Sequence, residues 1–482
     1  MRIFSAPHIA LTLIATICHC ICYSVNEQHN VAVTIEQRDA SIQGRAILPS
    51  QDPFYEPPEG FEGTVPGTVL RDRRVVASFL GIIPDFFADV RQVLYRTSAV
   101  DGSAIAAVTT IFSPVAAKKD RFVTYNAAYD SACVDCSPSY AYRWGNISAS
   151  ASLTADFLTM QVYLAEGFIV NSPDYEGPDA AFTAGRIAAM GVLDSMRAVQ
   201  NFASKHMGLA ARAGIVATGY SGGGLATAWA SALQPLYAPE LNIKGWAMGG
   251  VPANLSAMVE HIDNTLVSGF LPLAIAGLSK RSSYGASFLP LLDRTLTDKG
   301  RTLLDIARSN CVGSVLGRFS EQSIFDSDIQ SLGHSLLRHP IVVKVLRENV
   351  LAIREEETPT APVFLYHGHN DEVVVYNSSV KVYNEWCQNG ANVVFLNYAA
   401  GGHITTGAIS IIAAFDFVSR AFESRVQSGC SFNTVLDDSL NPLALGLNLE
   451  PVLVRLVDFL SHIGRNDQAW LAALKHNKSA VV

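Results

Sequence analysis

The stretch Gly214-Ile-Val-Ala-Thr-Gly-Tyr-Ser221-Gly-Gly-Gly-Leu-Ala-Thr-Ala-Trp229 decides the fold of this chain. Residues 215–218 are apolar and predict a short strand, and the alanine-rich residues after the glycines predict a helix. Between them, Gly219-Tyr-Ser221-Gly-Gly223 fits the G-x-S-x-G pattern of a serine in a tight strand-to-helix turn. Such a turn has no room for a Cβ atom two positions before or after the serine. We therefore predict that Ser221 stands above a sheet, where the helix N-terminus favours developing negative charge.

This pattern by itself is not diagnostic. In a chain of 482 residues, G-x-S-x-G arises by chance about one time in six, so a glycine-rich loop before a helix explains it equally well. Its context favours the functional interpretation, because the flanking residues predict the strand–turn–helix that a nucleophilic serine requires. A base and an acid must also follow at suitable places in the chain.

The composition is that of a folded globular chain. With 49% hydrophobic residues, 16% charged residues and 35 glycines, it predicts a large buried core and many turns. The length allows one large domain with insertions, or two domains. A net charge of −8 argues against a nucleic-acid partner, because no excess of positive charge is present to hold phosphates.

The first residues have the features of a secretory signal peptide, which we assign to residues 1–22 without a defined cleavage site. Arg2 supplies positive charge, and the apolar run at residues 9–17 is too short to span a bilayer. A membrane anchor is disfavoured because polar residues follow closely, at 24 and 26–28. We see no later apolar run long enough for a transmembrane segment, and we expect a secreted, extracellular protein.

Five cysteines remain after the signal peptide: Cys133, Cys136, Cys311, Cys387 and Cys430. An extracellular setting favours disulfides. Cys387 with Cys430 is one candidate pair, and Cys311 with either Cys136 or Cys133 is another. A zinc site is not predicted, because Cys133-x-x-Cys136 has no second matching pair. The Asn-x-Ser sequons, which are candidate glycosylation sites, lie at Asn146, Asn254, Asn377 and Asn477.

Strands and helices alternate along most of the chain. Candidate strands lie at residues 90–97, 104–112, 121–129, 168–172, 215–218, 243–248, 363–367 and 393–398. Candidate helices lie at residues 153–166, 182–205, 380–389 and 405–422, and the helix after Ser221 is expected to end at Pro235. This alternation is typical of an α/β fold with a mostly parallel sheet flanked by helices.

The alternation breaks between residues 254 and 357, where helix-like apolar segments appear without a strand. The most apolar of them, residues 266–278, is interrupted by Pro272. Two interpretations of this segment stay open: it lines an acyl site or faces a lipid surface, or it simply packs on the core. We interpret residues 254–357 as an inserted helical cap, or lid. Residues 23–253 and 358–482 then form one core, and the tail from Asn441 is apolar enough to pack against that core or to cover a site.

A serine hydroxyl becomes a nucleophile only when a base accepts its proton and an acid orients that base. In the α/β-hydrolase order both follow the serine, each just past the end of a later strand. Asp371 stands on the turn after the strand at 363–367, and His403 on a small-residue loop after the strand at 393–398. We therefore predict that Ser221, Asp371 and His403 are the catalytic residues.

Each of these residues also has a non-catalytic explanation. Asp371 suits a turn, and His367-x-His369-x-Asp371 at the end of a strand suits zinc. A zinc site would leave the glycine-flanked Ser221 unexplained, so we predict no metal. The histidines expected on the surface, because they lie on helical or inserted segments, are His206, His261 and His334.

Seven stretches of the chain resemble fungal-type secretory lipases of the Candida lipase A-like family, which are α/β-hydrolases with a helical cap. They are Tyr129-Asp-Ser131, Cys136-Ser-Pro-Ser139, Pro173-Asp-Tyr-Glu-Gly-Pro178, Gly219-Tyr-Ser-Gly-Gly-Gly224, Gly249-Gly-Val-Pro-Ala-Asn-Leu255, His367-Gly-x-x-Asp-Glu-Val-Val374 and Gly401-Gly-His403. They keep their order over residues 53–430, which chance does not explain. One departure is Val375-Tyr376, where the family often has a proline; it affects the turn but not the acid.

The resemblance implies the same triad of Ser221, Asp371 and His403. It implies that the backbone N–H groups of Asp130 and Gly222 form the oxyanion hole, and that residues 254–357 are the family's cap. The disulfides that it implies are Cys136–Cys311 and Cys387–Cys430, with Cys133 free. It favours triacylglycerols and long-chain esters as substrates, and the triad chemistry needs no metal or organic cofactor.

We therefore expect a secreted serine ester hydrolase, a triacylglycerol lipase that forms an acyl-enzyme. The alternatives are a carboxylesterase acting on small soluble esters or acylated metabolites and, less favoured, a serine peptidase or a non-catalytic binding protein on the same fold. A binding protein is disfavoured because no triad member is missing. The expected partner is a lipid or small ester, with transient contact between the cap and a lipid surface, and the sequence is compatible with a monomer.

Overall fold

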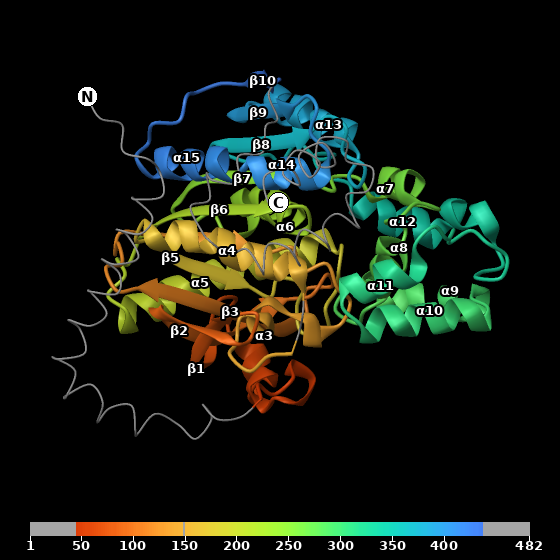
Figure 1. Cartoon of the computed structure of the whole chain (residues 1–482), viewed down its shortest axis with the longest axis horizontal. Coiled ribbons are helices and arrows are strands. Elements are labelled where there is room, and N and C mark those ends of the chain that lie inside the picture. The colour runs from red at the N-terminus through yellow and green to blue at the C-terminus, as the bar shows by residue number, and fades with distance from the viewer. Residues whose placement is uncertain (1–44, 148–149, 437–482) are drawn as a thin grey trace, which may run out of the picture. The chain divides into compact units, whose positions relative to one another are not determined.

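A ten-stranded sheet runs through the part of the chain that the computed structural model describes, residues 45–147 and 150–436 (Figure 1). The strand order is β1-β2-β3-β5-β4-β6-β7-β8-β9-β10. The strands are β1 (Val69–Phe79), β2 (Ile83–Ser98), β3 (Ala104–Pro114), β4 (Arg121–Asn126), β5 (Ile169–Pro173), β6 (Gly214–Tyr220), β7 (Ile243–Gly249), β8 (Val363–Gly368), β9 (Val393–Tyr398) and β10 (Ser431–Val435). β1, β2, β3 and β5 pair antiparallel, and every pair from β5 to β10 is parallel, so the predicted mostly parallel sheet is confirmed.

Helices cover both faces of this sheet. Successive residues of the elbow strand point to opposite faces: Ile215 packs into one apolar cluster and Val216 into another. The first cluster is covered by α5 (Gly185–His206), α6 (Gly222–Tyr237) and α13 (Tyr376–Gln388), and the second by α4 (Ala151–Ala165) and α15 (Ile411–Phe422). Parallel strands buried in this way read as continuous apolar runs, which is why the sequence predicted them well.

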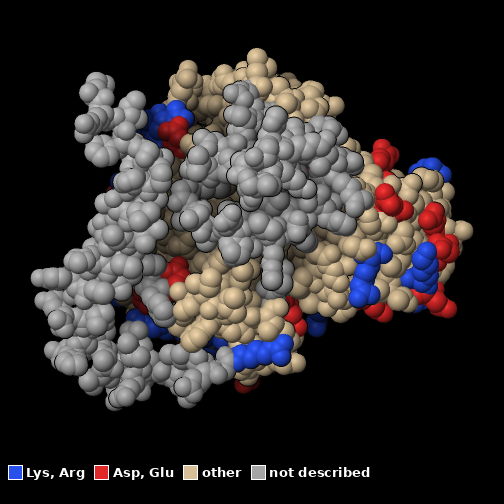
Figure 2. Space-filling view, viewed as in Figure 1, with Lys and Arg blue, Asp and Glu red and all other residues tan. Residues whose placement is uncertain are grey.

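Six α-helices and one 3-10 helix fill the segment between β7 and β8. They are α7 (Leu255–Ile262), α8 (Phe270–Leu278), α9 (Gly285–Thr295), α10 (Asp298–Ser309), α11 (Val312–Phe319), η7 (Gly333–Arg338) and α12 (Pro340–Glu348). Their inner faces form two apolar clusters. On α10, Leu304 is buried while Lys299 and Asp305 are exposed, and Figure 2 shows charges of both signs interspersed at this end of the molecule. Between β7 and β8 the chain thus forms helices and no strand, as the sequence predicts.

Several element predictions were wrong in detail. β1 was not predicted, because its charged run Arg71-Asp-Arg-Arg74 hides the alternation of this edge strand. α6 does not end at Pro235 but continues to Tyr237, since a proline in the last turn removes only one hydrogen bond. The single helix predicted at 405–422 is two helices, α14 (His403–Ile409) and α15, bent by 47° at Ser410.

Three predictions fall on residues that lie outside the described ones: the signal peptide at 1–22, the tail from Asn441 and the sequon at Asn477. Of the other sequons, Asn377 is exposed and Asn254 caps α7. Asn146 is buried, and its Nδ2 donates to the carbonyls of Ala141 and Arg143, so the folded chain does not present this amide for glycosylation. Among the described helices, none alone is both long and apolar enough to cross a membrane, although the bent pair α14–α15 passes that test when joined.

Candidate active site

Ser221 occupies the sharp turn between β6 and α6 that the sequence predicts. Its φ of 56° and ψ of −121° lie outside the regions that ordinary residues prefer. The backbone N–H of Ser221 donates to the Gly249 carbonyl on the neighbouring strand, over 2.9 Å. A Cβ atom on Gly219 would overlap the Gly223 carbonyl, and one on Gly223 would overlap the Asn126 carbonyl. The elbow glycines are therefore required by the close approach of three backbone segments.

The structure brings Ser221, His403 and Asp371 together. His403 Nε2 lies 2.9 Å from Ser221 Oγ, and His403 Nδ1 lies 2.8 Å from Asp371 Oδ2. Asp371 sits on the turn after β8, where its Oδ1 accepts the N–H groups of Val373 (2.9 Å) and Val374 (2.7 Å). This chain of hydrogen bonds is the geometry by which a histidine takes the proton of a serine hydroxyl.

The electrostatics of this relay favour a charged carboxylate beside a basic imidazole. Burial alone would raise the pKa of Asp371, but His403 and then His367 more than offset burial and hold that pKa well below its usual range. Burial alone would lower the pKa of His403; Asp371, with help from Glu372 and Asp130, raises it above its usual value instead. The ion pair that forms when His403 accepts a proton is thus stabilised.

Both predicted oxyanion-hole residues lie beside Ser221. Gly222 is the first residue of α6, so its N–H has no acceptor within the helix. Asp130 follows β4 with a φ of 50°, and its carboxyl group lies against the Gly222 Cα. Burial, reinforced by the Asp156 charge, raises the pKa of Asp130 to about 7. The oxyanion role of the two N–H groups stays a prediction, and the proximity of both residues to Ser221 supports it.

Sequence reasoning missed three groups that contact the relay. The Tyr220 hydroxyl donates to the His403 carbonyl (2.6 Å), and the two rings lie 5.0 Å apart. Glu372 accepts the His403 backbone N–H (2.9 Å), and burial raises the pKa of Glu372 to about 7. His367, which the sequence offered as a zinc ligand, bonds Asp371 instead (3.0 Å). The sequence signal that could have indicated these three groups is their position: Tyr220 and Glu372 adjoin predicted site residues, and His367 lies near the end of β8.

His367 and His369 do not share a site in the structure. His367 is fully buried, whereas His369 is exposed beside Tyr376, with ring centroids 4.8 Å apart. Within the described residues, no group of three or more His, Cys, Asp or Glu side chains is arranged to hold a metal ion. The three histidines that the sequence analysis expects on the surface are exposed: His206, His261 and His334.

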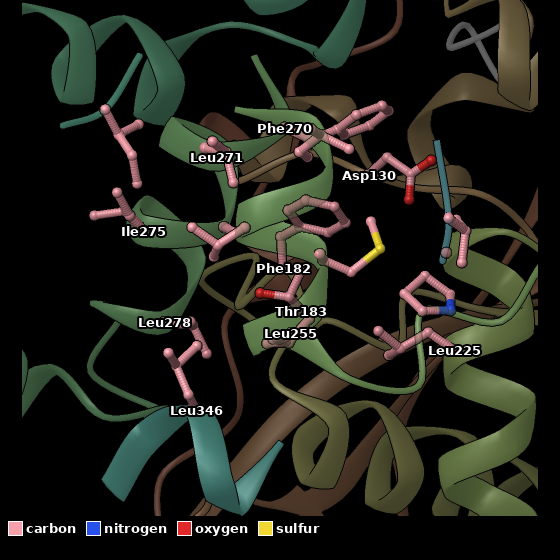
Figure 3. A pocket seen from close by; sticks show the side chains of 18 of the residues that line it. Asp130, Phe182, Thr183, Leu225, Leu255, Phe270, Leu271, Ile275, Leu278 and Leu346 are labelled. Carbon is pink, nitrogen blue, oxygen red and sulfur yellow. The ribbon is translucent and has the colours of Figure 1, made fainter. Parts of the chain in front are cut away.

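An apolar cavity of about 110 Å³ opens from Ser221 into the helical insertion. Figure 3 shows side chains from the core and from the insertion pointing into it. Apart from Ser221, the polar side chains on its wall are those of Asp130 and Thr183. The apolar side chains labelled in Figure 3 are those of Phe182, Leu225, Leu255, Phe270, Leu271, Ile275, Leu278 and Leu346. Helix α8, from the segment at 266–278, is therefore a cavity wall, and the cavity suits a hydrocarbon chain.

Two disulfides tie the insertion and the sheet edge to the core. Cys136–Cys311 joins the loop after β4 to the start of α11, across 175 residues. Cys387–Cys430 joins α13 to the start of β10. Both implied pairings are confirmed, and Cys133 is free and buried as the resemblance implied.

Comparison with known proteins decides the family. Residues 145–429 match the model of the family described as secretory lipase. The chain belongs to the secretory lipase family. The chain is similar to the secreted triacylglycerol lipase LIP1 of Malassezia furfur, with 37% identity over 84% of this chain and 82% of that one. LIP4 of Malassezia globosa is 34% identical over 90% of this chain and 95% of its own.

A solved structure extends this comparison to the fold. The closed state of Candida antarctica lipase A superposes with a TM-score of 0.75 at 26% identity, over 85% of this chain and 96% of that one. The fold of this secretory lipase is thus that of the α/β-hydrolases, and the chain is a carboxylic ester hydrolase. The predicted family, fold and enzyme class are confirmed.

Proposed function

We propose that the chain is a secreted triacylglycerol lipase that uses Ser221, His403 and Asp371. The observation that carries the proposal is that the relay ends at Ser221 Oγ, which lies on the wall of the apolar cavity. A nucleophile at the end of such a cavity suits an ester whose acyl chain fills the cavity. The relatives named as secreted triacylglycerol lipases support this choice of substrate.

The reaction begins when His403 Nε2 takes the Ser221 hydroxyl proton and Oγ attacks the ester carbonyl. The tetrahedral oxyanion is held by the N–H groups of Gly222 and Asp130, each worth about 3 kcal/mol in the transition state. His403 then gives its proton to the departing alkoxide, and the alcohol leaves an acyl group on Ser221. A water molecule, deprotonated by His403, attacks that acyl-enzyme, and the fatty acid leaves as the Ser221 proton returns.

We further propose that residues 254–357 act as a cap. Helices α7, α8, α9 and α12 supply much of the cavity wall, and Cys136–Cys311 fastens this segment to the loop that carries Asp130. A water-insoluble substrate requires the enzyme to contact a lipid surface, and we assign this transient contact to the cap. Secretion through a signal peptide at residues 1–22 is supported by the two disulfides and by the names of the relatives.

Hydrolysis of an emulsified long-chain triacylglycerol and of soluble p-nitrophenyl acetate tests this function. We expect the emulsion to be the preferred substrate, and both activities to disappear in Ser221→Ala. A strong preference for the short soluble ester would contradict the lipase assignment and favour a carboxylesterase. Full activity in a folded Ser221→Ala protein would contradict the serine mechanism itself.

A further inference from the structure

The carboxylate of Asp371 is bound by two imidazoles. Its Oδ2 atom lies 2.8 Å from His403 Nδ1 and 3.0 Å from His367 Nε2, while Oδ1 accepts the backbone N–H groups of Val373 and Val374. A carboxylate offers about four acceptor positions. Asp371 thus fills all of them, and only one of the four bonds is needed for the Ser221 relay.

His367 itself is fixed from its other side. It is the next-to-last residue of β8 and is fully buried. Its Nδ1 lies 2.8 Å from the Oγ of Ser379 on α13, and the Tyr376 ring meets its ring edge-on at 5.7 Å. Nε2 also lies 3.3 Å from the Val374 carbonyl. These contacts hold the imidazole against rotation about its Cβ–Cγ bond.

The hydrogen-bond partners determine the proton positions on this ring. Asp371 is ionised and can only accept, so His367 Nε2 must carry a hydrogen. A neutral ring then has its lone pair on Nδ1, which faces the Ser379 hydroxyl, and that hydroxyl also lies 3.4 Å from the Val251 carbonyl. Asp371 therefore selects the tautomer with the hydrogen on Nε2, and Ser379, at the opposite ring nitrogen, fixes the orientation of the ring.

We propose that His367 is a positioning residue that holds Oδ2 of Asp371 in line with His403 Nδ1. The proposal rests on the triad of the proposed function. With Oδ1 held by two amides and Oδ2 by two imidazoles, the carboxylate cannot turn about its Cβ–Cγ bond. A carboxylate fixed in this way holds His403 in the orientation in which its Nε2 faces Ser221 Oγ.

Two substitutions of similar polarity separate positioning from packing. The amide nitrogen of glutamine reaches the place of Nε2, so His367→Gln keeps the bond to Asp371. The amide of asparagine reaches only the place of Nδ1, so His367→Asn keeps the Ser379 side and loses Asp371. We expect His367→Gln to retain kcat within about threefold, and His367→Asn to lose about 10- to 100-fold in kcat with an unchanged KM, as befits one hydrogen bond to a charged group.

Val382→Ala provides the stability control. Val382 is a buried residue on the same helix as Ser379, and its truncation lowers the melting temperature without touching Asp371. Unchanged kcat in Val382→Ala, with the Gln and Asn variants differing, would support the proposal. Equal losses in both His367 variants, or a kcat near that of the wild type in His367→Asn, would overturn it.

A second measurement keeps the inference independent of substrate and of folding failure. The rate of Ser221 labelling by a fluorophosphonate reports activation of the nucleophile without any ester. If His367→Asn does not fold, Ser379→Ala frees the ring and should slow labelling about three- to tenfold, while an unchanged rate would refute the proposal. Absence of ester hydrolysis in a wild-type protein that is labelled normally would count against the proposed substrate, not against His367.

Discussion

His403 Nε2 lies 2.9 Å from Ser221 Oγ, although 182 positions separate the two residues in the sequence. Ser221 follows β6 and His403 follows β9, and strands β7 and β8 lie between β6 and β9 in the sheet. The loop after β9 must therefore reach back across the sheet edge, over Gly250, whose hypothetical Cβ would lie 3.1 Å from His403 Cε1 and 2.9 Å from the Tyr220 ring. Glycine at position 250, at a φ of 53°, makes this reach possible.

Ser221→Ala should lower kcat on any accepted ester by roughly 10⁴- to 10⁶-fold, because the nucleophile is lost while the binding groups remain. Fluorophosphonate labelling should disappear at the same time. The melting temperature should stay within a few degrees of the wild type, since alanine also fits the turn. Labelling that persists in the variant would place the reactive nucleophile elsewhere.

Gly223→Ala should destroy both activity and much of the stability, because the new methyl group would overlap the Asn126 carbonyl. The control is Gly317→Ala in α11, where a Cβ meets no atom within 4 Å. That change should stabilise the protein by about 0.5–1 kcal/mol through helix propensity. Thermal unfolding with ester hydrolysis checks both; a stable, active Gly223→Ala protein would contradict the tight-turn account.

Ile275→Ala should shift the enzyme toward longer acyl chains. A second cavity of about 30 Å³ shares Ile275, Leu292, Ile324 and Leu336 with the larger one, so these side chains form a wall between them. Removing Ile275 joins the two spaces, and the ratio of rates on C16 and C8 p-nitrophenyl esters should rise by about tenfold.

Leu303→Ala is the matched control for Ile275→Ala. Leu303 lines only the smaller cavity, so its truncation enlarges that space without opening the wall. Both variants lose buried methylene groups, and both should lower stability. An equal change of chain-length preference in the two variants would show that loss of stability, not the wall, controls the preference.

The protein should be more stable at pH 5 than at pH 8. Burial raises the pKa of Asp174 and Asp130 to about 7 and that of Asp156 to about 6. The folded state therefore holds more protons than the unfolded state between about pH 4 and 7, and the free energy of unfolding falls as pH rises through that window. We expect the melting temperature to drop by several degrees from pH 5 to pH 8.

Asp156→Asn tests the origin of this pH dependence. Asp156 is partly buried and accepts hydrogen bonds from the Tyr125 hydroxyl (2.7 Å) and the Ala128 N–H (2.8 Å). Its replacement removes one titrating group, so the fall in melting temperature between pH 5 and pH 8 should become smaller. Asp305→Asn, at an exposed position, should leave the fall unchanged. A melting temperature that rises with pH would contradict the assignment.

The sequence alone sufficed to name Ser221, His403 and Asp371, the three residues that the structure brings within hydrogen-bond distance of one another. Gly219 and Gly223 flank Ser221 because backbone segments crowd the turn, and Asp371 and His403 each follow a strand whose apolar run is plain in the sequence. These are local signals, since a tight turn and a buried parallel strand each impose residue types on a few neighbouring positions. The helical insertion was predictable for the same reason.

Tertiary structure alone decided the features that depend on distances between remote segments. Cys136 pairs with Cys311 while Cys133, three residues earlier, stays buried and free, and only the packing of the loop after β4 against α11 makes that choice. The second imidazole on Asp371 required His367 to be oriented by Ser379 on another element. The cavity beside Ser221 is likewise enclosed by helices from the core and the insertion, and a volume between separate elements leaves no periodic pattern in the chain.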